Sequence, residues 1–341
     1  MCSAWALPPQ PTRPPARCCG RGTPASSWEL EISMDLPAAL QQDLLVREHA
    51  PLAPLTTLGV GGLAPWVIEP RTRAELMLAV RELHAAGLAW RMLGHGSNLL
   101  VSDAGVPEVV LHTHLMKMIY HDGEREHALR CEAGASLSRL VSVALDVRLT
   151  GSECLMGIPG TVGGAVAGNS GGSSGAIGEL LREVTLVTPQ GEPEIVACSP
   201  DMFGYRRSPF AGRVILDAVL GLAPATPAAI RARMESVLRG KVKSQPLAAR
   251  SAGCMFKNPT GGSAGQLIDE AGCKGLRQGG ARVSERHANF VINDGSASAQ
   301  DVSRLLQRVT ERVSQRAGVD LALEVERWGP HAAPAEPSDS G

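Results

Sequence analysis

Residues 91–103 read Arg-Met-Leu-Gly-His-Gly-Ser-Asn-Leu-Leu-Val-Ser-Asp. Two glycines flank one residue, Ser97 and Asn98 follow, and an apolar run begins at Leu99. This pattern predicts a tight turn that leads directly into a buried strand. Such a turn exposes backbone N–H groups, and a compact set of these groups can bind a diphosphate. An ordinary turn explains a Gly-x-Gly pair equally well, so the functional interpretation needs a second signal.

The second signal is residues 157–172, which read Gly-Ile-Pro-Gly-Thr-Val-Gly-Gly-Ala-Val-Ala-Gly-Asn-Ser-Gly-Gly. So many residues with little or no side chain carry a large backbone entropy cost, which favours a loop that approaches a large, flat ligand closely. Neither glycine stretch is followed by Gly-Lys-Ser/Thr, and neither has the Gly-x-Gly-x-x-Gly spacing of a dinucleotide-binding helix. We therefore expect a dinucleotide cofactor held by a different fold.

Composition excludes several classes of function. The chain has 341 residues, with 33 basic against 34 acidic side chains, so it carries no electrostatic signal for nucleic acid or an anionic membrane. No apolar run approaches the roughly 18 residues of a membrane span. The 8 cysteines lack metal-ligand spacing and suit a reducing compartment. We expect a cytoplasmic monomer that contains no metal and binds no nucleic acid.

Alternating strand and helix signals predict an α+β chain with several parts. Residues 1–33 are rich in Pro, Arg and Ser and are predicted to be a disordered extension. The predicted parts that follow are two cofactor-binding subdomains, a substrate-binding domain and a loose tail, at residues 46–108, 109–224, 225–330 and 331–341.

Periodicity and capping residues predict the individual elements. Helices are expected at 72–84, 136–146, 226–242, 264–271 and 299–317. Strands are expected at 66–69, 89–93, 99–101, 108–112, 116–120, 127–132, 184–188, 194–197, 214–222, 287–293 and 321–325. The two glycine stretches are expected to be loops.

Five motifs in order resemble one known family. They are Leu-Gly-His-Gly-Ser-Asn-Leu-Leu (93–100), Gly-Ile-Pro-Gly-Thr-Val-Gly-Gly-Ala-Val-Ala-Gly-Asn (157–169), Phe-Gly-Tyr-Arg-Arg-Ser (203–208), Ser-Ala-Gly-Cys-Met-Phe-Lys-Asn-Pro (251–259) and Leu-Ala-Leu-Glu-Val-Glu-Arg-Trp-Gly (321–329). Together they are similar to the UDP-N-acetylenolpyruvoylglucosamine reductases, the MurB family of peptidoglycan precursor synthesis. The similarity runs from about Leu55 to Gly329. The short spacing from Cys254 to Glu324 resembles the compact form of the family, without its extra tyrosine loop.

The resemblance implies a fold and a reaction. The fold is a two-part FAD-binding domain of the vanillyl-alcohol-oxidase type followed by a C-terminal α+β substrate-binding domain. In the reaction, NADPH reduces FAD, and hydride then passes from flavin N5 to UDP-N-acetylglucosamine enolpyruvate. Protonation of the neighbouring carbon completes UDP-N-acetylmuramate.

The resemblance also assigns three catalytic positions. Cys254 takes the place of a serine proton donor, Arg206 that of the arginine near the substrate carboxylate, and Glu324 that of the glutamate. A thiol is more acidic than a hydroxyl, so the change from serine to cysteine is compatible with proton donation. Arg207 is an ordinary surface charge on this interpretation, and Glu326 remains a lesser candidate because alternation along the predicted strand places it on the same face as Glu324.

Most of the expected binding residues follow from the same motifs, whereas Lys243, His287 and Asn289 lie outside them. A lone cysteine is ordinarily a small buried hydrophobe, as expected here for Cys131, Cys154, Cys198 and Cys273. His95 stands where the family usually has a third glycine, and we expect its side chain to point to solvent. The expected FAD contacts are Gly94, His95, Gly96, Ser97, Asn98, Leu99, Ile158, Pro159, Gly160, Gly163, Gly164 and Asn169. The expected substrate contacts are Tyr205, Lys243, Lys257, Asn258 and Asn289, with His287 nearby in an unassigned role.

Two rival functions remain open. Another flavin oxidase or dehydrogenase of the same superfamily would share the first two glycine stretches but not the motif around Cys254. A flavin-binding or nucleotide-sugar-binding protein without turnover would not need the thiol, the guanidinium and the carboxylate together.

Overall fold

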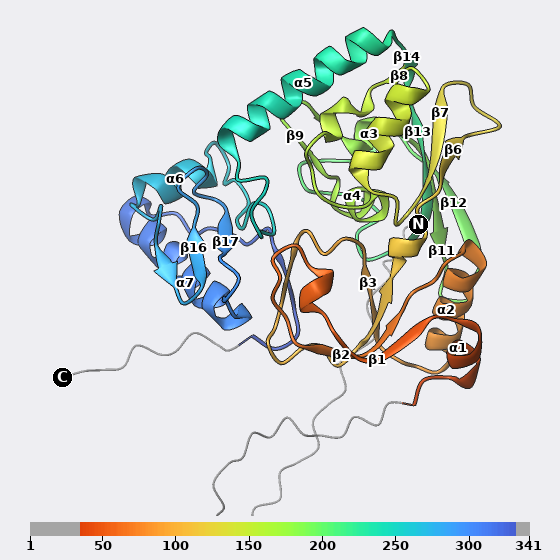
Figure 1. Cartoon of the computed structure of the whole chain (residues 1–341), viewed down its shortest axis with the longest axis horizontal. Coiled ribbons are helices and arrows are strands. Elements are labelled where there is room, and N and C mark those ends of the chain that lie inside the picture. The colour runs from red at the N-terminus through yellow and green to blue at the C-terminus, as the bar shows by residue number, and fades with distance from the viewer. Residues whose placement is uncertain (1–34, 332–341) are drawn as a thin grey trace, which may run out of the picture. The chain divides into compact units, whose positions relative to one another are not determined.

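The computed structural model describes residues 35–331. The extension predicted for residues 1–33 lies outside the described residues, as does the predicted tail beyond residue 331. Figure 1 shows the described chain as three successive groups of helices and strands, coloured orange, yellow to green, and blue.

The first group is a four-stranded sheet in the order β1-β2-β5-β3, covered by helices. Thr72 caps the longer helix by accepting a hydrogen bond from the Glu75 backbone N–H, and Leu76, Val80 and Leu83 of this helix are buried in the core. The elements are α1 (Ala38–Asp43), β1 (Val46–Pro51), β2 (Leu63–Ile68), α2 (Arg73–Ala85), β3 (Trp90–Leu93) and β5 (Val109–His112). Strands β2 and β3 both run parallel to β5, so their carboxyl ends meet at one edge.

The second group is a five-stranded antiparallel sheet in the order β12-β11-β13-β7-β6. Its strands are β6 (Ile119–His121), β7 (Ala128–Glu132), β11 (Leu181–Val187), β12 (Pro193–Ala197) and β13 (Val214–Gly221). Helices α3 (Leu137–Asp146) and α4 (Val162–Gly168) share a hydrophobic core with this sheet. Leu137, Leu140 and Ala144 provide the buried face of α3, as their helical spacing predicts.

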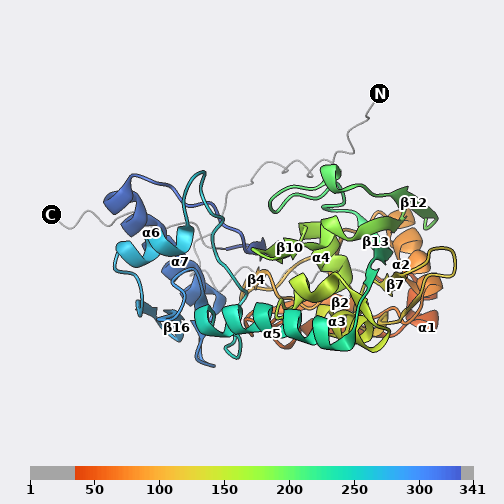
Figure 2. The ribbon, with the colours of Figure 1, turned by 90° about the horizontal axis from the view of Figure 1, so that it is seen from above.

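The third group packs helices against a three-stranded sheet in the order β15-β16-β17. Its elements are α6 (Ala264–Glu270), β15 (Arg277–Gln278), β16 (Ala281–Val283), β17 (Val291–Asn293) and α7 (Ala299–Ala317), and α5 (Pro227–Ser244) leads into it from the second group. In Figures 1 and 2, α5 runs from beside α3 of the second group towards the blue third group. Helix α7 has the bounds that its periodicity predicts and begins at the Ser298 cap.

Short elements complete the chain. They are η1 (Ala53–Leu55), β4 (Leu99–Val101), η2 (Thr113–Leu115), β8 (Leu149–Thr150), η3 (Ser152–Leu155), β9 (Gly171–Gly172), β10 (Gly175–Ala176), η4 (Ile177–Glu179), η5 (Pro200–Met202), β14 (Ala223–Pro224) and β18 (Glu326–Trp328). Strand β18 pairs in parallel with β4, so the end of the chain returns to the first group.

This return corrects one predicted strand. Residues 321–325 do not form a strand, and the strand begins only at Glu326. The preceding residues instead run alongside the 254–257 segment. Leu323 forms an isolated antiparallel β-bridge with Phe256, and the Lys257 N–H donates to the Ala322 carbonyl at 2.8 Å. The alternation argument for Glu324 and Glu326 therefore does not apply, because Glu324 lies outside the strand.

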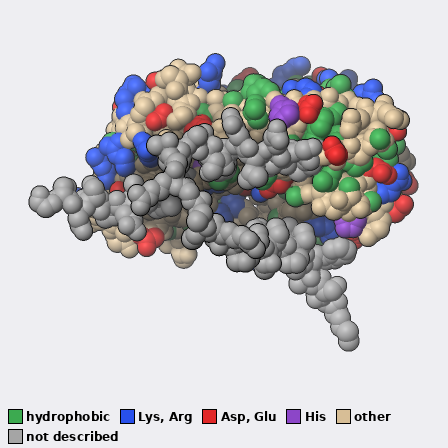
Figure 3. All heavy atoms as spheres, turned by 90° about the horizontal axis from the view of Figure 1, so that it is seen from below, with side chains coloured by type: hydrophobic (Ala, Val, Ile, Leu, Met, Phe, Trp, Pro, Cys, Tyr) green, Lys and Arg blue, Asp and Glu red, His purple; other side chains and the backbone are tan. Residues whose placement is uncertain are grey.

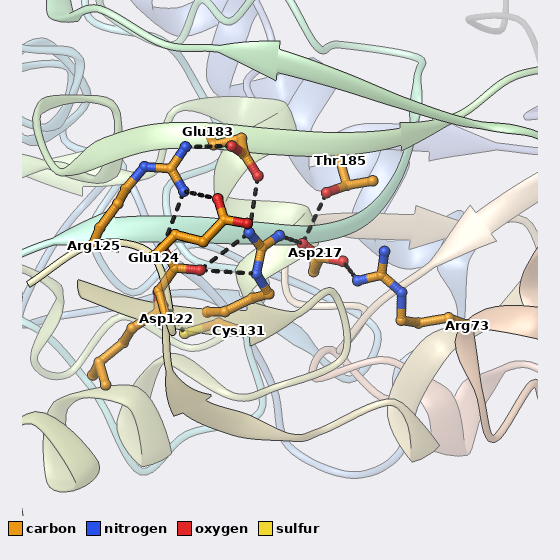
Figure 4. Close-up of polar contacts among 10 residues, drawn as sticks. Arg73, Asp122, Glu124, Arg125, Cys131, Glu183, Thr185 and Asp217 are labelled. Carbon is orange, nitrogen blue, oxygen red and sulfur yellow. Dashed lines mark hydrogen bonds and ion pairs between the residues drawn. The ribbon is translucent and has the colours of Figure 1, made fainter.

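A network of buried charges joins the first and second groups (Figure 4). Arg73 of α2 pairs with Asp217 of β13, which is fully buried. Arg130 of β7 also reaches Asp217, with 2.8 Å between Nη1 and Oδ1. The same guanidinium contacts Asp122 and Glu183, and Arg125 pairs with both of these carboxylates. Each buried charge is thereby paired, which offsets its loss of hydration.

On the face shown in Figure 3, basic side chains gather on the left and hydrophobic ones on the right. Of the helices within residues 35–331, none combines the length and the apolar character needed to cross a bilayer.

Candidate active site

A cavity of about 790 Å³ lies among the three groups of elements. Its wall is made largely of loops: residues 92–99, the second glycine stretch, Arg206, residues 251–254 and Glu324 all contribute. This volume falls in the range of pockets that hold a cofactor or a drug-sized ligand. Loops meet here because the strand ends and helix ends of all three groups converge on the same space.

The first glycine turn is shaped by close backbone contacts. Gly96 has φ +60°, and a Cβ at this position would lie 2.3 Å from the Leu55 carbonyl oxygen, so only glycine fits. The backbone N–H groups of residues 95–98 have no hydrogen-bond acceptor among the described residues. His95 is exposed, as predicted, although it also lines the cavity. This turn therefore presents free donors at the cavity wall.

The second glycine stretch is a turn followed by a short helix, which corrects the predicted loop. Thr161 caps α4 by accepting a hydrogen bond from the Gly164 N–H, and Gly163 packs on Ala133, where a Cβ would come within 2.9 Å of that side chain. Some of these glycines are therefore ordinary packing residues. By contrast, Gly168 and Gly172 line the cavity, and a Cβ added at either would have no atom within 4 Å, so a side chain there would project into open space.

Cys254, Arg206 and Glu324 all line this cavity. The Arg206 Nε donates to Glu324 Oε1 at 2.6 Å, and its Nη1 donates to the Gly171 carbonyl at 3.3 Å. The side chains of Arg206 and Glu324 are 28% and 11% exposed, so the ion pair is partly desolvated. Arg206 also has a positive φ of 50°, which is unfavourable for a residue with a Cβ.

The backbone at Cys254 is fixed by contacts with the 289–290 segment. Cys254 forms an isolated antiparallel β-bridge with Phe290, and the next residue, Met255, donates its N–H to the Asn289 carbonyl at 2.9 Å. Burial raises the pKa of the thiol to about 11, the Glu324 carboxylate acts in the same direction, and Arg206 opposes them. The thiol therefore stays protonated near neutral pH, as a proton donor must be.

Comparisons with known proteins agree with this geometry. The family model described as the FAD binding domain matches residues 64–197, and the model for the C-terminal domain of UDP-N-acetylenolpyruvoylglucosamine reductase matches residues 245–328. The reductase of Moorella thermoacetica is 41% identical over 300 residues, covering 87% of this chain and 97% of that protein. That of Sphingopyxis alaskensis is 40% identical, covering 82% and 94%.

Among solved structures, the Thermus caldophilus enzyme, UDP-N-acetylenolpyruvylglucosamine reductase (MurB), matches with a TM-score of 0.71 and 39% identity, covering 84% of this chain and 99% of its own. The chain belongs to the UDP-N-acetylenolpyruvoylglucosamine reductase family. The resemblance of the five motifs to this MurB family is thereby confirmed. The predicted α+β class and the predicted enzyme class, a flavin-dependent oxidoreductase, are confirmed with it.

Most of the residues predicted from the MurB motifs meet at the cavity. Besides Cys254, Arg206 and Glu324, the predicted residues that line it are Gly94, His95, Gly96, Ser97, Asn98, Leu99, Ile158, Pro159, Gly160, Gly163, Gly164 and Lys257. Ser97 donates its hydroxyl to the Pro159 carbonyl at 3.0 Å, which ties the two glycine stretches together. Asn98 donates its side-chain amide to the Glu324 backbone carbonyl at 3.1 Å and so joins the first turn to the segment that carries Glu324.

Asn169 and Tyr205 lie at a neighbouring cavity of about 340 Å³, which shares Arg206 and Gly171 with the large one. The Asn169 side chain donates to the Gly204 carbonyl and accepts from the Gly178 N–H. Its role in the structure is to hold the loop that carries Arg206. Tyr205 is 62% exposed at the rim.

Asn258, of the motif at 251–259, and Asn289, which lies outside the five motifs, make structural contacts. Asn258 Oδ1 accepts from the Ala264 N–H at the start of α6. Asn289 is buried, its Oδ1 accepts from the Phe256 N–H at 2.9 Å, and its Nδ2 donates to the Phe256 carbonyl at 2.8 Å. Asn289 therefore fixes the backbone that follows Cys254. His287 lies outside the lining of the large cavity and packs on Phe290.

Lys243 does not line the large cavity, whereas Lys241 does. Lys241 Nζ donates to the Met156 carbonyl at 2.6 Å, and burial lowers the pKa of this amine. Helical periodicity could have identified this lysine: Ile230, Met234 and Leu238 lie on one face of α5, and that face continues to position 241.

Arg207 and Glu326 are weaker candidates than their neighbours. Arg207 is exposed and lines neither of the two cavities. Glu326 reaches the large cavity, but its Oε1 accepts from the Trp328 indole N–H at 2.8 Å. Arg206 and Glu324 thus remain the stronger candidates at the large cavity.

Proposed function

We propose that this chain reduces UDP-N-acetylglucosamine enolpyruvate to UDP-N-acetylmuramate with NADPH as the source of hydride. The observation that carries the proposal is that a thiol, a guanidinium and a carboxylate from three separate motifs line one cavity. Membership of the family supports the choice of substrate, because the relatives are named for this reduction.

The same cavity fits FAD. Its wall includes the free N–H groups of residues 95–98, which suit a diphosphate, and the bare backbone at Gly168 and Gly172, which leaves room for a flat ring. The FAD-binding family model also covers the residues from β2 to β12. When bound there, FAD supplies the hydride.

Each member of the catalytic set has a distinct task. Arg206 donates from Nε to Glu324 and from Nη1 to the Gly171 carbonyl. A guanidinium has five N–H donors, so others remain for a substrate carboxylate. Glu324 orients this guanidinium. The protonated Cys254 thiol donates its proton to the carbon next to the substrate carboxylate, and the neighbouring cation stabilises negative charge that develops there.

Anaerobic half-reactions test the proposal. Purified protein reconstituted with FAD should lose its flavin absorbance on addition of NADPH, and UDP-N-acetylglucosamine enolpyruvate should restore it with formation of UDP-N-acetylmuramate. Restoration by an alcohol or sugar in place of this substrate would favour another oxidase of the superfamily. Binding of FAD without reduction by NADPH would favour a non-catalytic binding protein.

We further propose the division into parts at residues 108/109 and 224/225, with a monomer in the cytoplasm. The start of β5 at Val109 and the Thr226 cap of α5 lie close to these two boundaries. Sedimentation at several concentrations measures the oligomeric state.

A further inference from the structure

Two parallel strands bring a carboxylate and two imidazoles together at a place that the proposed reaction does not use. Glu69 directly follows β2, and His112 is the last residue of β5. Because Ile68 of β2 pairs with Leu111 of β5, Glu69 and His112 leave the sheet side by side. His114 follows within η2, and its ring stacks on that of His112 with centroids 4.1 Å apart.

The three side chains point one atom each at a common space. Glu69 Oε1 lies 3.4 Å from Nδ1 of His112 and 3.7 Å from Nδ1 of His114. Their candidate ligand atoms all lie within 4.8 Å of one another. Nitrogen and oxygen ligands at about 2.0–2.1 Å from a tetrahedral Zn²⁺ are about 3.3 Å apart, so small side-chain movements would close this geometry.

Burial and exposure are both suited to an ion. The side chains of Glu69 and His112 are only 9% and 8% exposed, while that of His114 is 41% exposed. The inner two groups are thus fixed, and the outer side is open for entry of an ion and a water ligand.

Arg47 is a cation that already pairs with the carboxylate of this cluster. Its Nη2 donates to Glu69 Oε1 at 2.8 Å, and its Nε is buried without a partner among the described residues. Arg47 is 40% exposed, so it can turn towards the second carboxylate oxygen when an ion takes the first. Its positive charge must weaken the binding of any cation.

We propose that Glu69, His112 and His114 bind one divalent transition-metal ion of the Zn²⁺ type, with solvent completing its coordination. One carboxylate and two imidazoles are ligands that such ions accept. Thr113, between the two histidines, lines the 790 Å³ cavity, whereas Glu69, His112 and His114 do not. The ion therefore lies behind the cavity wall, where it joins the ends of β2 and β5 and acts structurally.

Titration of the FAD-loaded full chain with Co²⁺ tests this site. We expect one ion per chain with the visible absorption of tetrahedral Co²⁺, displaced by Zn²⁺, without the ultraviolet band that thiolate ligands produce. Because His114 is partly exposed, His114→Asn should leave the fold intact and weaken binding on the order of 10-fold or more. Arg47→Gln should strengthen binding, because it removes a competing positive charge.

His121→Asn is the matched control, since His121 is an exposed histidine of β6 outside the cluster, and it should leave Co²⁺ affinity unchanged. Zn²⁺ should also raise the melting temperature of the wild type but not of His114→Asn. Unchanged affinity in His114→Asn, a thiolate band, or no Co²⁺ absorption at millimolar ion would overturn the proposal. None of these outcomes depends on turnover, so they are independent of the proposed reaction.

Discussion

At the scale of single residues, the proposed proton donor, Cys254, is a thiol where the family pattern has a hydroxyl. Cys254→Ser should retain part of the activity, because a hydroxyl can occupy the same place and carry a proton. Cys254→Ala should leave flavin reduction by NADPH intact and lower product formation by about 10²-fold or more. Stopped-flow measurement of the two half-reactions separates these effects. Equal loss of both half-reactions in Cys254→Ala would remove the role assigned to the thiol.

The pKa of the same thiol leads to a pH prediction. A thiol with a pKa near 11 has about 10⁻⁴ of its population as thiolate at pH 7, so alkylation of Cys254 should be slow and rise about tenfold per pH unit up to that value. Peptide mass spectrometry after iodoacetamide pulses measures this rate at Cys254 alone.

Substitution of the two neighbouring charged residues should change the alkylation rate of Cys254 in opposite directions. The Glu324 carboxylate raises the thiol pKa, so Glu324→Gln should accelerate alkylation, whereas Arg206→Gln should retard it. A plateau near pH 8.5 in the wild type would mean that Cys254 is an ordinary exposed thiol.

At the scale of elements, two adjacent glycines of α4 have different tasks. A Cβ at Gly163 would meet Ala133 at 2.9 Å, so Gly163→Ala should lower the free energy of unfolding by about 1–3 kcal/mol. A Cβ at Gly164 meets only Thr161 Oγ1 at 3.5 Å, so Gly164→Ala should be neutral or stabilising by up to about 1 kcal/mol.

FAD binding should change in the opposite order, with Gly164→Ala weakening it more than Gly163→Ala. Gly164 is exposed at the cavity wall, and a methyl group there occupies space that the cofactor needs. Urea titration and FAD titration of both proteins measure the two quantities. Weaker FAD binding in Gly163→Ala alone would show that the free side of α4 does not face the cofactor.

The segment after Cys254 depends on one buried amide. Asn289→Ala leaves the N–H and the carbonyl of Phe256 without their partners, so the free energy of unfolding should fall by about 2–4 kcal/mol. Asn258→Ala is the control, because Asn258 is exposed and should cost about 1 kcal/mol or less. Urea unfolding measures both. Similar losses in the two variants would contradict the clamp assigned to Asn289.

At the scale of the whole molecule, the charge network of Figure 4 holds the first and second groups together. Asp217→Asn removes the carboxylate that both Arg73 and Arg130 contact, and should lower the free energy of unfolding by about 3–5 kcal/mol. Glu194→Gln breaks the more exposed pair with Arg213 and should cost about 1 kcal/mol or less. Denaturant unfolding of both variants tests the contrast, and a loss below that of Glu194→Gln would contradict it.

Local signals were sufficient for most elements and for the catalytic trio. The Thr72 cap, the apolar face of α3 and the strands of the second sheet follow from patterns within a dozen residues, because helix and strand periodicities are properties of neighbouring positions. The candidates Cys254, Arg206 and Glu324 follow from their positions in the five ordered motifs. Lys243 is the predicted contact whereas Lys241 lines the cavity, because α5 lies outside the five motifs and they carry no information about which of its faces meets Met156.

The amino-acid order alone therefore determined most of the secondary structure and the family, and it singled out Cys254, Arg206 and Glu324 as the candidate catalytic residues. Only the tertiary structure decided that residues 321–325 run alongside the 254–257 segment instead of forming a strand. It also decided that the Asn289 side chain bonds the Phe256 backbone and that Glu69 lies beside two histidines. The physical reason is that these outcomes depend on which distant backbone groups are satisfied by one another. That pairing has no periodicity along the chain.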